Sequence, residues 1–210
     1  MGKVMMMTAT VDQQNNQILS PLCSNCPEPY FKKAHPDLPN AGCCSYSPTF
    51  SLFELWKMVQ KDERFVRRLF ELPTAEVLET EVKVHAHVHE GYSDRDDLSS
   101  LSPIEQSDLI ERYSVCVFLR NGKGCMLDAS FKNAVCRSFI CPSVEATLSN
   151  ELLHEIQAAI HAIQHEAKQF HTTCKQVLQE LGLSLKKDHD EVIRFLKQYY
   201  PEPDLHEKRS

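Results

Sequence analysis

The sequence predicts an α+β fold that is mainly helical and carries a small antiparallel sheet. A long stretch, residues 149–181, repeats apolar residues at helical spacing. Residues 75–90 instead alternate apolar and polar side chains, which predicts a strand. Residues 113–129 place two short apolar runs around an Asn-Gly turn, the pattern of a β-hairpin. Helical patterns cover more of the chain than strand patterns, so this class is favoured.

The N-terminal part of the chain has little periodicity. Residues 1–20 are polar with scattered methionines and are predicted to form a loose segment. Residues 21–50 are rich in proline and contain four cysteines, but they show no apolar face to bury. This segment is therefore expected to need a ligand or a cross-link to become ordered.

Capping signals mark two helices in the middle of the chain. The stretch "SLFE" places Ser51 and Glu54 in a capping box, and the helix that follows is expected to end before Pro73. The stretch "SPIEQSDLIER" repeats the arrangement with Ser102 and Glu105. Both stretches predict a helix start.

Two helices are predicted near the C-terminus. Gly182 suits the position just past the helix over 149–181, and "DHDE" begins a last helix that runs to Tyr200. We expect this helical pair, within residues 143–200, to pack behind a cysteine-rich region that covers 21–142. Residues 201–210 form a charged tail.

The net charge and the hydropathy of the chain limit the classes of partner that we expect. The net charge is −6 and no block of Lys or Arg stands out, so no nucleic acid partner is expected. The N-terminus lacks the apolar segment of a signal peptide, and no apolar run has the length of a membrane span. We therefore expect no membrane association and a cytoplasmic location, where thiols stay reduced.

The cysteines are the main chemical signal. The chain has nine, of which Cys174 lies alone on the apolar stripe of the long helix and is expected to pack as a core residue. The other eight form two groups, an N-terminal and a C-terminal one, and are the candidate metal ligands: Cys23, Cys26, Cys43 and Cys44, then Cys116, Cys125, Cys136 and Cys141.

The spacing within these groups favours metal binding. Cys23 and Cys26 are three positions apart, so both sulfurs can face one ion from a tight turn. Eight thiolates suit two tetrahedral ions, or an iron–sulfur cluster with a second site. Buried free thiols and a disulfide framework are the alternatives; the reducing compartment disfavours the second.

Cys43 and Cys44 are adjacent, and their side chains are expected to diverge, so each would serve a different metal centre. The remaining ligands of each centre would then come from the C-terminal group. We therefore expect the two cysteine groups to meet in space.

The segment "CVFLRNGKGCMLDASFKNAVCRSFIC" resembles the signature of the YkgJ-like cysteine-cluster proteins, described as zinc- or iron-chelating domains. A C-x-x-C element and a Cys-Cys doublet precede that signature in the family, and the eight cysteines agree with it in order and number. The resemblance covers roughly residues 21–142 and implies metal chelation. A flagellin lysine methylase shares the cysteine pattern, so the resemblance also leaves an iron–sulfur enzyme open.

The histidines are weaker candidates for metal ligands than the cysteines. "VHAHVHE" would place His85, His87 and His89 on one face of a strand, able to hold Zn or Ni, but a solvated polar face is favoured. His161 and His165, on the long helix opposite its apolar stripe, are likewise expected to be solvated. Arg137, beside Cys136, is expected in a surface ion pair, with donation to thiolates as the alternative.

The sequence thus predicts a metal-binding cysteine-cluster protein whose partner is a metal ion, Zn²⁺ or iron, the latter possibly in an iron–sulfur cluster. The metal is expected to be at least structural. The alternative is an iron–sulfur enzyme with an activity like that of a protein lysine methylase. No catalytic motif or cosubstrate motif decides whether the chain is an enzyme.

Overall fold

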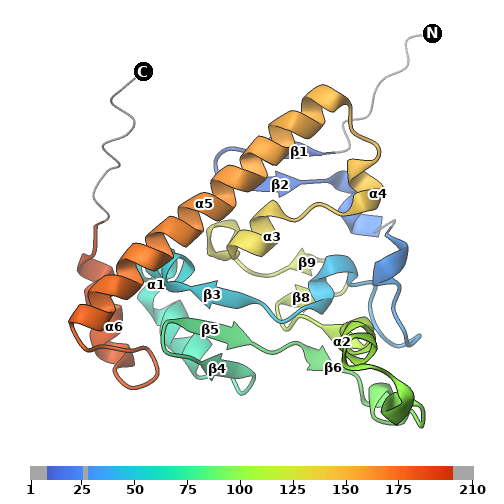
Figure 1. The fold of residues 1–210 in the computed structure, drawn as a ribbon, viewed down its shortest axis with the longest axis horizontal. Coiled ribbons are helices and arrows are strands. Elements are labelled where there is room, and N and C mark those ends of the chain that lie inside the picture. The colour runs from blue at the N-terminus through green and yellow to red at the C-terminus, as the bar shows by residue number, and fades with distance from the viewer. Residues whose placement is uncertain (1–8, 26–27, 201–210) are drawn as a thin grey trace.

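The computed structural model describes residues 9–25 and 28–200 and confirms the α+β class, mainly helical with small antiparallel sheets (Figure 1). The helices of the described residues are α1 (Leu52–Phe70), α2 (Pro103–Arg112), α3 (Ala134–Ser138), α4 (Pro142–Glu145), α5 (Asn150–Glu180) and α6 (His189–Gln198). The strands are β1 (Thr10–Asp12), β2 (Gln17–Leu19), β3 (Thr49–Ser51), β4 (Ala75–Val77), β5 (Glu81–Val84), β6 (His87–Val88), β7 (Ser114–Val115), β8 (Leu119–Arg120) and β9 (Gly124–Cys125).

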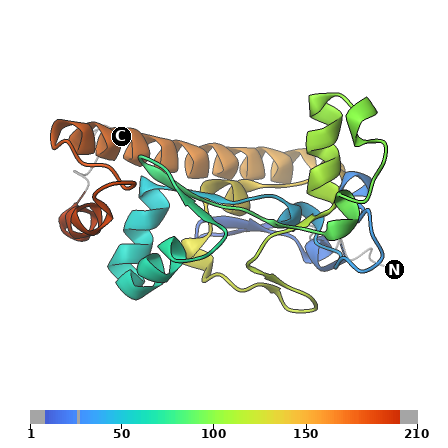
Figure 2. The same ribbon diagram turned by 90° about the horizontal axis from the view of Figure 1, so that it is seen from below.

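Helix α5 runs across the whole fold and confirms the long helix that the sequence predicts (Figure 1). The side chain of Ser149 accepts a hydrogen bond from the backbone N–H of Leu152 and caps the first turn. Gly182 ends the helix with a φ of 68°, a left-handed conformation that glycine adopts without strain. In the view of Figure 2 the helix lies along the upper side of the molecule, and only the α2 region reaches as high.

Helix α1 begins with the predicted capping box, in which Ser51 and Glu54 each bond to the other's backbone N–H. Asp62 interrupts it with a φ of −153°, outside the helical range. The Asp62 carboxylate then accepts a hydrogen bond from the backbone N–H of Phe65 at 3.1 Å. A second N-terminal cap therefore restarts the helix after the kink.

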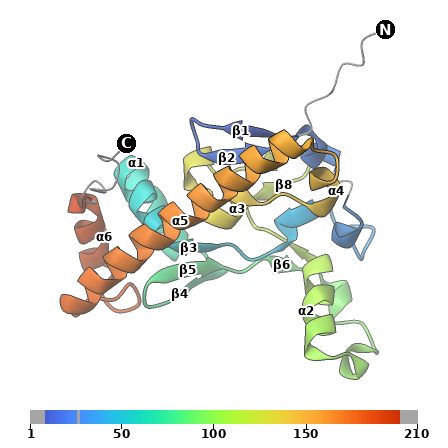
Figure 3. The same ribbon diagram turned by 45° about the horizontal axis from the view of Figure 1, so that its top comes forward.

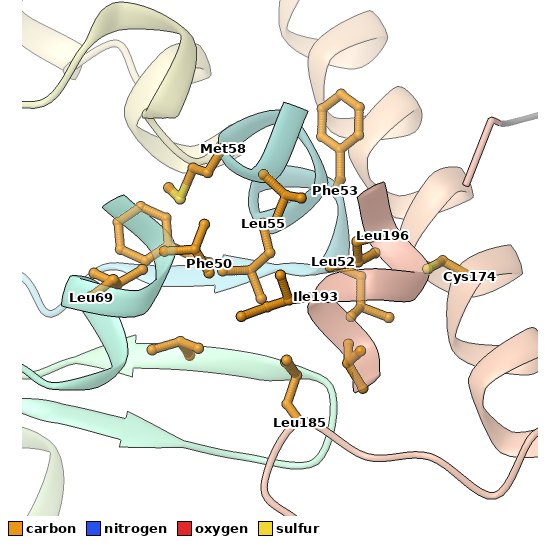
Figure 4. Close-up of a cluster of buried hydrophobic side chains, with 14 of the residues drawn as sticks. Phe50, Leu52, Phe53, Leu55, Met58, Leu69, Cys174, Leu185, Ile193 and Leu196 are labelled. Atoms are coloured by element: carbon orange, nitrogen blue, oxygen red, sulfur yellow. The ribbon is translucent and has the colours of Figure 1, made fainter. Parts of the chain in front are cut away.

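The main hydrophobic core lies where α1, α5, α6 and the sheet β3-β5-β4 meet. Fully buried side chains come from each of these elements, among them Phe50, Leu55, Cys174 and Ile193 (Figure 4). Each such apolar side chain contributes roughly 1.5–3 kcal/mol through burial. The two C-terminal helices, α5 and α6, thus pack on α1.

A second hydrophobic cluster lies at the other end of α5. Strands β1 and β2 form an antiparallel hairpin, and Ile18 of β2 packs with Val144 of α4 and Ile156 of α5 (Figure 3). The sequence predicted a loose segment over 1–20, but within it residues 10–19 are ordered by this contact; residues 1–8 lie outside the described part. The error arose because the apolar pattern of two three-residue strands is too short to detect.

The predicted strand over 75–90 is wrong as a single element. Residues 78–80 turn between β4 and β5, and the backbone N–H of Leu78 donates to the carbonyl of Glu81 at 2.9 Å. Strand β6 then leaves this sheet and pairs with β7. His85, His87 and His89 therefore do not share one face of a continuous strand.

The other predicted elements are present. Helix α2 has the Ser102–Glu105 capping box. The Asn-Gly turn joins β8 to β9, with Gly122 at a φ of 71°. Helix α6 ends at Gln198, two residues earlier than predicted. The tail 201–210 lies outside the described residues.

We expect Lys57 of α1 to make stability depend on pH above neutrality. Burial, and to a lesser degree the charge of Arg137, lower the pKa of Lys57 to about 8. Between about pH 8 and the unfolded value near 10.5, the unfolded chain binds the proton that the folded chain has lost, so stability rises with pH in this window. Chemical denaturation of wild type and Lys57→Met across pH 7–11 should show that the stability of wild type relative to the variant rises through this window, because the thiols contribute equally to both proteins. Equal slopes for both proteins would contradict it.

Candidate metal centre

One cavity brings together cysteines from both groups of the sequence. It has a volume of about 520 Å³ and is lined by five thiol side chains: Cys23, Cys43, Cys44, Cys125 and Cys141. The first three come from the N-terminal segment and the last two from the C-terminal group. Cysteines from both groups therefore line one cavity, whereas Cys116 and Cys136 are not part of its lining. Cys26 lies outside the described residues.

Cys43 and Cys44 lie on one short 3₁₀ turn, η3 (Gly42–Ser45). Cys44 departs from helical geometry, with φ −81° and ψ 28°. This backbone allows the Cys43 thiol to hydrogen-bond to the sulfur of Cys44. The expectation that the two adjacent side chains diverge is therefore wrong, and both face the same cavity.

The backbone connects Cys116 to this doublet. The N–H of Cys116 donates to the carbonyl oxygen of Cys44 at 2.8 Å. Cys116 lies after β7 and before β8, so this bond joins the hairpin β8–β9 to turn η3. Cys125 on β9 pairs in register with Leu119 rather than with Cys116, so the two cysteines are not opposite one another on the hairpin.

Cys136 is positioned by polar neighbours. Asn133 caps α3, and its side-chain oxygen accepts the backbone N–H of Cys136 at 2.8 Å. The hydroxyl of Tyr46 lies 2.9 Å from that oxygen and 3.1 Å from the sulfur of Cys136. Burial, together with Cys136, raises the pKa of Tyr46, so this phenol stays protonated. Its single proton is donated to the Asn133 oxygen, which leaves the hydroxyl oxygen able to accept from the Cys136 thiol.

The thiols differ in acidity. The pKa of Cys44 falls to about 7, because the hydrogen bond from Cys43 and the charge of Lys132 outweigh its burial. The same hydrogen bond, with burial, raises the pKa of Cys43. Burial also raises the pKa of Cys116, to about 11, and those of Cys125 and Cys136. A metal that bound several of these thiols would therefore release protons.

The sulfurs surround the cavity without closing into a compact shell. Within residues 9–25 and 28–200, no three cysteine sulfurs lie within 4.8 Å of one another. A tetrahedral zinc ion with Zn–S bonds of about 2.3 Å holds its four sulfurs about 3.8 Å apart. Thiolates on different irons of one cluster are held further apart than this. The present arrangement therefore needs inward movement to hold a single ion.

Arg137 is not the surface residue that the sequence predicted. Only 1% of its side chain is exposed, and its guanidinium lies 3.9 Å from the carboxylate of Glu54, which is equally buried. It donates to the carbonyl of Asn16 at 3.2 Å and lies over the ring of Phe53. This cation connects α3 to α1 and to the β1–β2 turn.

Cys174 lies in the main core, where it is 0% exposed, away from the cysteine cavity (Figure 4). Burial raises the pKa of its thiol to about 12, so it remains protonated at neutral pH. We expect Cys174→Ser to leave the metal content unchanged and to cost about 1–3 kcal/mol for the buried hydroxyl. Metal analysis with urea denaturation measures both quantities. Loss of half of the metal would contradict this assignment.

The histidines separate into different environments. His85 is exposed and its Nε2 lies 2.8 Å from the carboxylate of Glu76, while His87 is exposed on β6. His161 and His165 are exposed on α5, as predicted. His89 instead stacks on His35, with ring centroids 4.2 Å apart.

Sequence analysis missed one group of possible ligands. His35, Asp37 and His89 have candidate ligand atoms that all lie within 4.8 Å of one another, and no other such group occurs in the part of the chain that the structure describes. More than fifty positions separate His35 from His89, so no local spacing could have indicated the group.

Comparison with known proteins adds no family: no protein-family model, no curated protein and no solved structure matches the chain. Among the described residues, no helix is long and apolar enough to cross a membrane.

Proposed function

We propose that the protein is a metal-binding cysteine-cluster protein that holds zinc or iron, with the metal at least structural. The observation that carries the proposal is that thiols from two distant parts of the chain line one cavity. Reactive sulfur groups gathered in this way are typical of metal sites, whereas structural buried cysteines pack singly. Under this proposal the protein works in the cytoplasm, where its thiols remain reduced.

A structural role for the metal is supported by the few other contacts that order the cysteine-containing segment between β2 and β3. Between β2 and β3 the described chain forms only the short 3₁₀ turns η1 (Pro21–Asn25), η2 (Pro29–Phe31) and η3. Its main apolar anchors are Leu38, which is 5% exposed, and Phe31, whose ring meets that of Phe139 edge-on at 5.9 Å. Metal bonds from Cys23, Cys43 and Cys44 would tie this segment to the hairpin and to α4.

The second candidate is an iron–sulfur enzyme, and the cavity itself favours it. Its volume falls within the range of ligand-binding pockets and exceeds what one ion needs. Part of its wall is apolar and includes Phe31, Phe139 and Val144. The spread of the sulfurs also suits a [4Fe–4S] cluster, which takes one thiolate for each iron.

Anaerobic purification followed by elemental analysis and an absorption spectrum tests the proposal. We expect a stoichiometric amount of zinc in a colourless protein, or iron with inorganic sulfide in a brown one. Cys44→Ser should reduce the metal content, while Cys174→Ser, a matched change at a buried core thiol, should not. A wild-type protein without metal, or equal metal in the two variants, would overturn the proposal.

A further inference from the structure

The group of His35, Asp37 and His89 lies outside the cysteine cavity and is built from two distant segments. His35 and Asp37 belong to the loop between η2 and η3. His89 follows β6, and its backbone N–H donates to the carbonyl of Tyr113 at 2.8 Å. The backbone N–H of Ala34 donates to the carbonyl of Arg112 at 3.1 Å, which fixes the other segment beside the same helix end. The two imidazoles stack with 26° between their planes.

We propose that His35, Asp37 and His89 form a second metal site, which binds a divalent transition metal through two imidazole nitrogens and one carboxylate oxygen. Such a donor set suits Zn²⁺, Fe²⁺, Co²⁺ or Ni²⁺ better than Mg²⁺ or Ca²⁺, which prefer oxygen ligands. Three protein ligands leave a coordination position open to water.

The distances between the candidate ligand atoms are close to those around a bound metal ion. Nδ1 of His35 lies 3.7 Å from the carboxylate oxygen of Asp37. Zinc with Zn–N and Zn–O bonds near 2.1 Å holds two ligand atoms about 3.4 Å apart at the tetrahedral angle. The three candidate ligand atoms all lie within 4.8 Å of one another. Because a metal lies in the plane of each imidazole that binds it, one of the two stacked rings has to rotate, and Asp37 has to move inward, to complete the shell. Asp37, with 78% of its side chain exposed, has room to make that movement.

Hydrogen bonds already orient both rings. The backbone N–H of Gly91 donates to Nδ1 of His89 at 3.0 Å, and that of Asp37 donates to Nδ1 of His35 at 3.3 Å. A Cβ atom at Gly91 would lie 3.1 Å from Nδ1 of His89 and 3.3 Å from Cδ2 of His35, so glycine leaves space for the two stacked rings. A metal bound at Nδ1 takes the place of the backbone donor there and leaves the proton on Nε2. A metal bound at Nε2 instead needs that proton to move to Nδ1, where it would face the backbone N–H, so Nδ1 is the favoured ligand atom. Only neutral imidazole binds a metal, so binding weakens as the pH falls.

Cobalt titration of the full chain, read by absorbance and by equilibrium dialysis, tests the site. The variants are His35→Asn, His89→Asn and Asp37→Asn. In the two histidine variants, asparagine keeps a side-chain oxygen that can accept the backbone N–H two residues later; in Asp37→Asn it removes the charge and keeps the shape. We expect each variant to bind one equivalent of cobalt less than wild type. The sulfur-to-cobalt charge-transfer band, which reports the cysteines, should stay unchanged. His87→Asn, on β6 but outside the group, should bind as wild type does.

The two proposals fail separately. If the sulfur-to-cobalt charge-transfer band is absent, the proposed cysteine site is contradicted. The second site still stands if one equivalent of cobalt binds and depends on His35 and His89. Equal cobalt binding by wild type and all three variants would overturn the second site. A loss of cobalt binding in Asp37→Asn cannot be explained by misfolding, because this exposed side chain contributes little to packing.

Discussion

Replacement of Arg137 by methionine is expected to lower the free energy of unfolding by about 3–5 kcal/mol, among the largest costs of any single side chain in this protein. Methionine fills a similar volume, so the loss does not come from a cavity. It comes from the carboxylate of Glu54, which stays buried after its counter-charge is removed. Thermal and urea denaturation measure the change.

Glu54 cannot relax easily to avoid this cost. Its carboxylate accepts hydrogen bonds from the backbone N–H and hydroxyl of Ser51 and from the backbone N–H of Ala134. These bonds hold it at the start of α1, while Arg137 supplies the positive charge from α3. Glu54→Gln can keep the bonds to Ser51 but loses the acceptor for the Ala134 N–H, and it removes the charge. Because the Arg137–Glu54 ion pair can be lost only once, the double variant with Arg137→Met should cost less than the sum of the two single changes.

Arg68→Met is the matched control, because Arg68 pairs with Asp62 at 3.5 Å but is 61% exposed. A surface pair of this kind contributes at most about 1 kcal/mol. Equal losses for Arg68→Met and Arg137→Met would contradict the buried-pair explanation. Metal content measured on the same samples separates this effect from any change at the adjacent Cys136.

If the cysteine cavity holds the proposed metal, its removal is expected to expose residues 21–50 and 113–141 to protease together. Structural zinc in finger peptides supplies on the order of 10–16 kcal/mol of folding free energy, which is comparable to the whole stability of a typical domain, about 5–15 kcal/mol. Because Cys43 and Cys44 share a cavity with Cys125 and Cys141, loss of the metal releases both walls of that cavity. Limited proteolysis with and without a chelator, analysed by mass spectrometry, locates the cuts.

Single cysteine changes should reproduce the result of chelation. Cys43→Ser and Cys136→Ser each remove one thiol, and each should increase cleavage in both segments rather than in its own alone. Cys174→Ser should leave the pattern of cuts as in wild type, because this thiol lies in the main core. Cuts confined to the mutated segment would show that the two cysteine groups act separately.

The sequence predicted best where short-range chemistry decides the structure. The capping boxes at Ser51 and Ser102 and the apolar stripe of α5 lie within a few turns, so they could be recognised without tertiary information. The Asn-Gly hairpin was predictable for the same reason.

Tertiary contacts decided the features that were missed. Strand β2 forms because Ile18 reaches α5, and the strand over 75–90 breaks because β6 pairs with β7 instead of extending β5. Arg137 is buried because Glu54, more than eighty positions away, offers a counter-charge. The pairing of His35 with His89 depends on two loops held against α2, which no local pattern encodes.

Helix α5 has a further consequence for how the molecule opens. Its 31 residues, at about 1.5 Å each, span about 46 Å. Ile156 near one end belongs to the cluster under β1 and β2, while Leu178 near the other belongs to the main core. Neither cluster can open fully without releasing part of the same helix. Helix α5 therefore couples the two ends of the protein, and we expect amide hydrogen exchange along α5 to report one cooperative unit.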